Sequence, residues 1–267
     1  MTSSHPAQPP TTASDDQEGG AKARSAILHL TDAFDAMVEA EEIAVQVETS
    51  HVFKAMYGWW VGIVRSSKAV VLLHDNGLDR EAEPIVRSIV QHALTLQWVV
   101  DVGDEALDAI TEHGENERDR MLGHAKRAGW SFPGDDGDSE PRAAGGSHRL
   151  LPMVKNFAAL CAAYDAQSAY VVFCLLSGTV HPSVAGATAY FDDELRLNSA
   201  PVRESFAGLI ATAACLVQTM KTINRLLADN PFDDAIDRAE SALGMRVDPP
   251  VLKAEFGPQP PDTMPEA

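Results

Sequence analysis

Apolar side chains recur at every third or fourth position along most of the chain, the spacing that places them on one face of an α-helix. The pattern predicts helices over residues 22–48, 51–74, 80–100, 105–128, 149–164, 168–176, 201–228 and 232–243. No run of β-branched or alternating residues lies between hairpin turns, so the sequence predicts no strand. We therefore expect an all-α fold, an antiparallel helical bundle of about six to eight helices.

The residues between the predicted helices are of the types that commonly begin or end helices. Asp75-Asn76-Gly77 ends one helix, Asp79 is able to cap the next, and Pro201 occupies a first turn, where proline is tolerated. We find no internal repeat, and residues 22–246 are therefore expected to form one bundle domain.

Three segments are rich in Pro, Gly, Ser and Asp and contain too few apolar residues to repay the entropy of ordering. They predict a disordered N-terminal tail over residues 1–21, a flexible loop over 131–147 and a disordered Pro-rich tail over 247–267. The acidic loop lacks the alternating Asp pattern and the closing Glu of an EF-hand, so it is interpreted as a solvated connector.

Composition limits the class of protein. Hydrophobic residues make up 45% of the 267 residues, enough for a real core, and no apolar run approaches the length of a membrane span. The net charge of −18 argues against broad nucleic-acid binding, which needs a basic surface. The three cysteines, Cys161, Cys174 and Cys215, show no disulfide or zinc spacing. We expect an acidic cytoplasmic protein that does not bind a membrane.

The helix predicted over residues 80–100 carries an unusual polar stripe. Its apolar residues share one broad face, while Arg87, Gln91, Thr95 and Trp98 follow one another at spacings of three and four beside that face. A buried guanidinium or amide without a partner costs about 1–3 kcal/mol, so this stripe is expected to meet partners. His92 lies about 140° from Arg87 on an ideal helix, and it is interpreted as a core histidine on the apolar side.

Other polar residues are weaker candidates. Arg120 and His124 in ERDRMLGHAKR share a helical face, and they form either a solvated surface or the edge of a binding site for an anionic ligand. In LLSGTVHPS, His181 precedes a proline, which disfavours helical geometry and predicts a defined turn at a helix end. Glu48 and His51 have one copy of a spacing that di-iron bundles use twice, so we expect neither a metal nor a cofactor.

Two stretches resemble known proteins. GLDREAEPIVRSIVQHALTLQWVVD at 77–101 and LLSGTVHPS at 175–183 are similar to elements of a group of uncharacterised bacterial all-helical proteins with a domain of unknown function. The resemblance covers roughly residues 30–225. This chain has Gln91 where that group tends to have glutamate, which argues against a role that needs a carboxylate there.

RSIVQH at 87–92 also resembles the Arg-x4-6-His signature of HEPN-type domains, helical bundles that often dimerise and in many cases cleave RNA in toxin, antiphage or stress systems. The resemblance implies a metal-independent ribonuclease. In it Arg87 would hold the scissile phosphate, and His92 would take or give a proton. The sequence contains no serine hydrolase order, phosphate loop or dinucleotide fingerprint.

Two hypotheses follow. The first is a binding or interaction module with a small polar pocket for an unknown, anionic or hydrogen-bonding ligand. Its binding residues would be Arg87, Gln91, Ser177, His181, Arg120 and His124. We expect Arg87 to lie closer to Gln91 or to the Ser177–His181 segment than to His92. The alternative is the ribonuclease, with Arg87 and His92 as catalytic residues and RNA as substrate. Both hypotheses are compatible with a homodimer.

Overall fold

Ten α-helices account for most of the residues that the computed structural model describes, which are 13–41, 43–130, 148–192, 194–201 and 205–258. The long helices are α1 (Ala13–Glu39), α2 (Ser50–His74), α3 (Asp79–Val102), α4 (Asp104–Arg127) and α9 (Ala207–Asn224). The shorter ones are α5 (Leu151–Lys155), α6 (Phe157–Ala163), α7 (Gln167–Val180), α8 (Val184–Thr188) and α10 (Asp233–Leu243). Short 3-10 turns cover Val47–Thr49 and Ala254–Phe256. No strand occurs in these ranges, and the predicted all-α bundle is confirmed.

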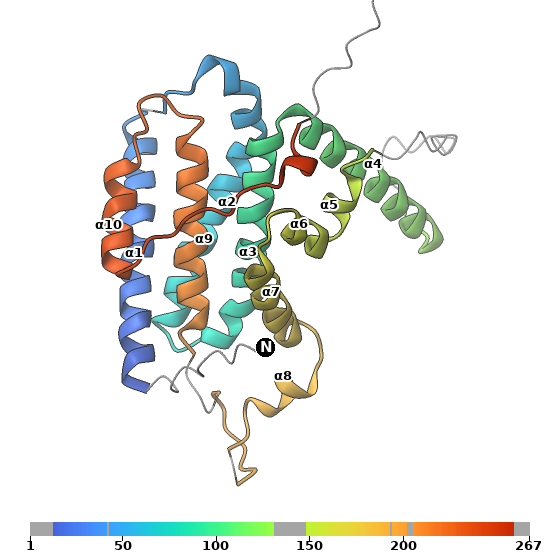
Figure 1. The fold of residues 1–267 in the computed structure, drawn as a ribbon. Helices are drawn as coiled ribbons and strands as arrows, with labels where there is room; N and C mark the ends of the chain where they lie inside the picture. Colours follow the sequence, from blue (N-terminus) through green and yellow to red (C-terminus); the bar gives the residue numbers. More distant parts are fainter. Residues whose placement is uncertain (1–12, 42, 131–147, 193, 202–204, 259–267) are drawn as a thin grey trace, which may run out of the picture.

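α3 lies at the centre of the bundle, where it packs against α2, α9 and α7, while α1 covers α9 and α10 (Figure 1). Trp60 of α2 is one of the largest fully buried side chains of the core. Phe34 and Phe232 meet the Trp60 ring edge-on, at centroid distances of 4.8 and 5.6 Å. Trp60 therefore joins α1, α2 and the start of α10. None of the described helices has the length and apolar content needed to cross a membrane.

The first helix begins earlier than the sequence indicated. α1 starts at Ala13, so the prediction of a disordered tail is wrong for residues 13–21. Gly20 is buried, and a Cβ atom there would lie 2.2 Å from the Phe206 ring. Gly20, which the sequence placed in a disordered tail, therefore allows close packing against the start of α9. Residues 1–12 lie outside the described ranges.

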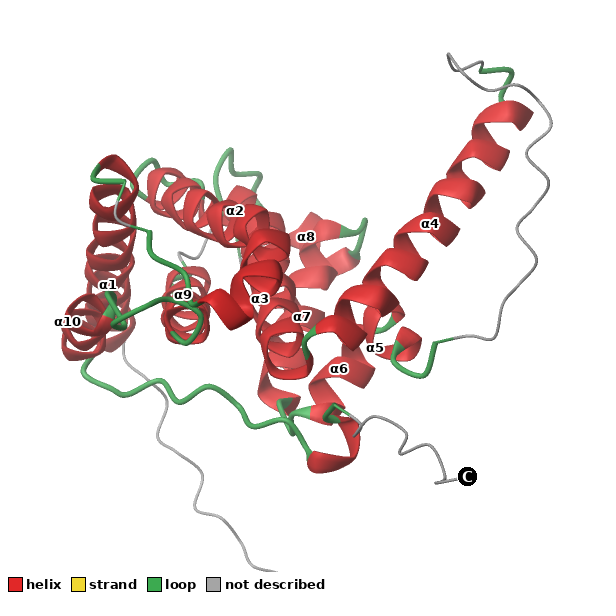
Figure 2. Cartoon of the chain, turned by 90° about the horizontal axis from the view of Figure 1, so that it is seen from above, coloured by secondary structure: helices red, strands yellow, loops and turns green. Residues whose placement is uncertain are grey.

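The helix predicted over residues 149–164 is two helices, α5 and α6. Asn156 between them is extended, with φ −135° and ψ 106°, and its side chain accepts a hydrogen bond from the Ala158 N–H at 2.9 Å. Asparagine is a favoured N-cap because its side chain satisfies a free amide of the first turn. α4 contacts α3 and α5, and its C-terminal part projects away from the other helices (Figure 2). The predicted loop at 131–147 lies outside the described residues.

Two further boundaries differ from the prediction. α9 begins at Ala207, and Pro201 lies in the segment before it rather than in its first turn. α8, which the sequence did not predict, has only five residues and is started by Ser183, whose Oγ accepts from the Gly186 N–H at 3.0 Å. The segment between α7 and α9 therefore contains a capped helix.

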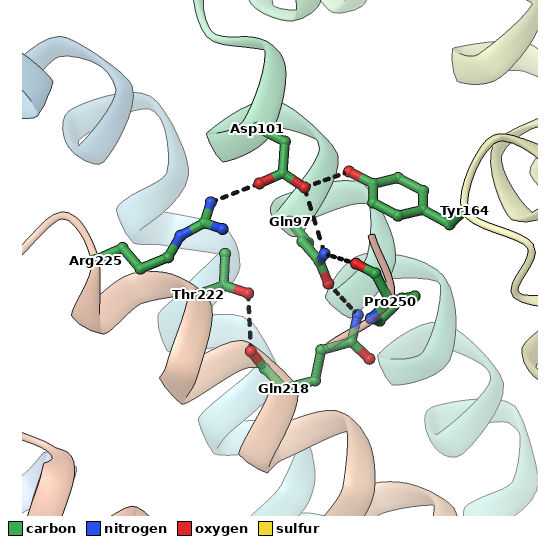
Figure 3. A network of polar contacts seen from close by, with 7 residues as sticks. All are labelled: Gln97, Asp101, Tyr164, Gln218, Thr222, Arg225 and Pro250. Carbon is green, nitrogen blue, oxygen red and sulfur yellow. Dashed lines mark hydrogen bonds and ion pairs between the residues drawn. The ribbon is translucent and has the colours of Figure 1, made fainter. Parts of the chain in front are cut away.

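The C-terminal segment was expected to be disordered from residue 247, and this is wrong for residues 247–258. It crosses the bundle, and Gln97, only 2% exposed, donates to Pro250 O at 2.6 Å (Figure 3). The Lys253 N–H donates to Ala163 O at 3.0 Å, and the Lys253 side chain pairs with Asp165 at 2.7 Å. We call residues 247–258 the C-terminal strap. Residues 259–267 lie outside the described ranges.

Around Gln97 the strap meets a polar network (Figure 3). Gln218 of α9 donates to Gln97 Oε1 at 2.7 Å, which leaves the amide of Gln97 bonded on both sides. One turn further along α3, Asp101 accepts hydrogen bonds from Tyr164 at 2.7 Å and from Arg225 at 2.6 Å. Burial, together with the Asp101 carboxylate, raises the pKa of Tyr164 well above its ordinary value. The network ties α3, the end of α6 and the end of α9 to the strap.

Candidate functional site

Arg87 is held between α3 and α7. Its Nε donates to Ser177 Oγ at 2.8 Å, and its guanidinium carbon lies 4.1 Å from the centre of the Phe173 ring. Ser177 Oγ in turn donates to Phe173 O at 2.7 Å. A guanidinium over an aromatic face gains electrostatic energy from the ring quadrupole. The expected contact of Arg87 with the Ser177–His181 segment is confirmed, and the side chain is fixed by its neighbours.

His92 lies on another side of α3. Its Nδ1 shares a hydrogen bond of 3.0 Å with Ser88 Oγ, and its ring is 6.1 Å from the ring of Trp59 on α2. The prediction of a core histidine is wrong, because His92 is exposed. Gly58 and Gly62 have no side chains to fill the space between α2 and α3, and they leave a shallow pocket of about 130 Å³ that His92 lines. Arg87 and His92 therefore contact different helices.

The remainder of the polar stripe is only partly satisfied. No hydrogen bond joins Arg87 to Gln91 among the described residues, so of its two expected neighbours Arg87 contacts the Ser177–His181 segment. Gln91 is half-buried, and its backbone carbonyl accepts from Thr95 Oγ1 at 2.8 Å. Trp98 is fully buried, and within the described ranges its Nε1 has no hydrogen-bond partner. The stripe is mainly a packing surface, with Arg87 as its one strongly bonded member.

His181 is positioned by the end of α7. The helix ends at Val180, and His181 is extended, with φ −94° and ψ 148°, as expected for a residue before proline. Ser183 stabilises the turn because its Oγ donates to Gly178 O. The imidazole is exposed and lines a pocket. The predicted turn histidine at a helix end is confirmed.

This pocket, which we call the α3/α7/α8 pocket, has a volume of about 520 Å³. Its polar lining residues are Arg80, Glu81, Thr179, His181, Ser183 and Tyr190. They come from the start of α3, the end of α7, the start of α8 and the residues that follow it. Polar groups that converge on one hollow from several segments are typical of a small-molecule site.

The charges around the pocket are mixed. Arg80 Nη1 donates to Glu83 Oε1 at 2.9 Å, and Tyr190 OH donates to Glu81 Oε1 at 3.3 Å. Burial and the neighbouring Glu81 carboxylate raise the pKa of Tyr190 above its ordinary value. Glu83 Oε2 is buried and has no hydrogen-bond partner within the described ranges. The pocket thus offers both donors and acceptors.

Sequence reasoning missed Arg80 and Tyr190. Arg80 lies seven residues before Arg87, two turns earlier on the same face of α3, and this spacing could have revealed it. No comparable signal exists for Tyr190, because the fold alone brings residue 190 beside residue 81.

The remaining candidates lie elsewhere. Arg120 and His124 are exposed on α4, where Arg120 pairs with Glu117 of its own helix. The structure does not bring them to Arg87. His51 pairs with Asp104 Oδ1 at 2.7 Å rather than with Glu48. Among the described residues, no group of three or more potential metal ligands is assembled.

Comparison with known proteins gives one result. A sequence profile with the description "Family of unknown function (DUF5677)" matches residues 53–196, more than half of the chain. The match runs from α2 to the residues after α8 and contains Arg87, His92 and the α3/α7/α8 pocket. No curated protein and no solved structure matches the chain.

Proposed function

The chain belongs to the family of unknown function DUF5677, and we propose that it is a binding module whose ligand occupies the α3/α7/α8 pocket. The observation that carries the proposal is the convergence of Arg80, His181 and Tyr190 on one hollow of about 520 Å³. That volume lies within the range of ligand pockets, which is about 300–1,000 Å³. We propose a cytoplasmic module that needs neither metal nor cofactor and that holds its ligand through the side chains of the pocket.

The chemistry of the lining defines the class of ligand. Arg80 supplies positive charge, the Tyr190 phenol is bonded to Glu81, and the His181 imidazole borders the mouth of the pocket. A small anion that also carries hydrogen-bonding groups fits this set, because Arg80 supplies positive charge and the His181 imidazole supplies a ring nitrogen for a hydrogen bond. Arg87 contributes indirectly, because its bond to Ser177 fixes the last turns of α7 against α3.

The ribonuclease remains the alternative hypothesis. It needs Arg87 and His92 on the same phosphate, whereas Arg87 is bonded to α7 and His92 lies beside α2. A metal-independent cleavage site also needs its acid-base group within hydrogen-bond reach of the reacting atoms. The separation of the two side chains within one chain supports the binding module over the nuclease.

Nuclear magnetic resonance of the histidine rings tests the proposal. Inorganic phosphate and malonate, added at constant ionic strength, are expected to shift the His181 resonances saturably, while those of His124 on α4 stay in place. Arg80→Gln should weaken this binding at least several-fold, and Arg120→Gln should not. If neither anion shifts His181, or if both variants respond like the wild type, the pocket is not an anion site.

A further inference from the structure

α7 has an exposed apolar face. None of the residues Gln167–Val180 is charged, and none of them is buried, although the helix is strongly apolar. Its inner side packs on α3 and α6 through Arg87, Ser177 and Phe173. On its outer side, Val171 is 56% exposed and Leu175 is 70% exposed. An apolar stripe of this kind on the surface marks an interaction site more often than an isolated exposed side chain does.

The outer residues have the spacing of a helix–helix seam. Val171, Cys174, Leu175 and Gly178 follow one another at intervals of three, one and three residues, so they form one stripe along α7. Gly178 is the hollow in this stripe, since a Cβ atom built there would meet nothing within 4 Å. The stripe therefore carries a large side chain at one end and a hollow at the other.

This arrangement is complementary to itself. If two α7 helices lie antiparallel about a two-fold axis between Cys174 and Leu175, each Val171 faces the partner's Gly178. Each Cys174 then faces the partner's Leu175. A two-fold interface requires this reciprocity, in which residue i meets j and j meets i. We propose that a second copy of this chain covers the outer face of α7 in this register.

The distribution of charge favours a second copy at this face. The chain has a net charge of −18, so two copies repel one another over most of their surfaces. α7 carries no charged side chain, and charge repulsion between copies is therefore lower there than at the acidic parts of the surface. In the segment that follows α7, Val184, Leu195 and Leu197 are also exposed, at 80%, 78% and 81%.

The size of the seam sets the expected affinity. A helix of this length spans about 21 Å, and one pair of such helices lies at the small end of specific interfaces, which begin near 1,200 Å². We therefore expect a dimer in the micromolar range. The same register brings the partner's Ser168 to the end of α7, the turn that leads into His181, so each copy would border the other's α3/α7/α8 pocket. This last point rests on the proposed function, whereas the dimer does not.

Sedimentation velocity at concentrations from about 1 to 200 µM tests the dimer. The wild type is expected to shift from the mass of one chain, 28.7 kDa, to twice that mass as concentration rises. Leu175→Glu places two like charges beside the axis and should abolish the shift. The matched control is Leu72→Glu, because Leu72 is also a helical leucine and is 65% exposed, and this variant should still dimerise. A monomer at every concentration, or a Leu175→Glu dimer, overturns the proposal.

Cross-linking with a short bismaleimide tests the register. Each Cys174 thiol adds across one maleimide double bond, so no oxidant is needed. Cys174 is exposed, whereas Cys161 is buried and Cys215 is partly buried, and burial raises the pKa of Cys161 to about 11 and that of Cys215 to about 12, so both should react more slowly than Cys174. We expect a covalent dimer from the wild type and none from Cys174→Ser or Leu175→Glu. A dimer that Cys174 does not cross-link, or a cross-link that survives Cys174→Ser, shows that another surface joins the copies.

Discussion

Arg87 Nε and Ser177 Oγ lie 2.8 Å apart and connect the middle of α3 to the end of α7. His92, five residues after Arg87, shares its hydrogen bond with Ser88 and lies beside Trp59 of α2. The arginine and the histidine of RSIVQH therefore belong to two different helix contacts. The arginine fixes α7 against α3, and the histidine lines the shallow pocket between α2 and α3.

The contact of Arg87 predicts an order of stabilities. Arg87→Ala removes both the bond to Ser177 and the packing on Phe173, and we expect it to lower the free energy of unfolding by roughly 1–2 kcal/mol. Arg87→Met should lose less, because methionine still covers the Phe173 ring. Urea denaturation measures both variants. Arg120→Ala, whose arginine pairs only within the exposed part of α4, is the control and should stay within about 0.5 kcal/mol of the wild type. Equal losses for Ala and Met would mean that packing on Phe173 contributes nothing.

The separation of Arg87 from His92 predicts that the purified chain does not cleave RNA without metal. Mixed RNA incubated with the protein and a chelator should be degraded no faster than with an Arg87→Ala, His92→Ala double variant. The measurement is the rate of RNA loss on a denaturing gel. Cleavage by the wild type that each single variant abolishes, with circular dichroism unchanged, would establish the ribonuclease instead.

Most of the bundle was predictable because helical periodicity is a local signal. The predicted limits of α2, α3, α4 and α10 agree with the structure to within two residues at each end. The prediction failed where one polar residue interrupts an apolar run. Asn156 was expected to lie inside a helix, but its side chain caps α6 and separates that helix from α5.

The candidate site was less predictable because its geometry depends on contacts between distant segments. His92 is exposed because Gly58 and Gly62, on a different helix, leave space beside it. The strap was missed because its main contact uses the backbone carbonyl of Pro250, which has no side-chain signature. The turn at His181, in contrast, was predicted correctly, because proline restricts the residue that precedes it.

The contacts of the C-terminal strap predict that the effect of a C-terminal truncation on the free energy of unfolding depends on where the chain is cut. Deletion of residues 247–267 leaves the buried Gln97 without the Pro250 carbonyl and removes the Val247 carbonyl, to which Lys221 donates at 2.9 Å. We expect a loss of roughly 1–3 kcal/mol in unfolding free energy. Deletion of residues 259–267 alone is the matched control and should change it by less than about 0.5 kcal/mol. The two denaturation midpoints should therefore differ, and identical midpoints would show that the strap contributes nothing to stability.

The hydrogen bonds of Glu240 predict how the free energy of unfolding depends on pH. Its Oε1 accepts hydrogen bonds from Lys221 Nζ at 2.6 Å and from the Val247 N–H at 2.7 Å. Burial raises the pKa of Glu240, but these two donors outweigh it and hold the pKa below its ordinary value. The unfolded chain therefore binds the proton more readily than the folded one does.

It follows that the stabilisation is fully present above the unfolded pKa of about 4.3 and is lost as the pH falls through the lower pKa of the folded state. Glu240→Gln cannot titrate, so its deficit in unfolding free energy relative to the wild type should be largest near neutral pH and should shrink in acid. Urea denaturation at several pH values between about 7 and 3 measures this difference. In the Lys221→Met background the deficit should be smaller at neutral pH, because the charge that favours the carboxylate is gone. A deficit that stays constant across this range would show that Glu240 contributes through packing rather than through its charge.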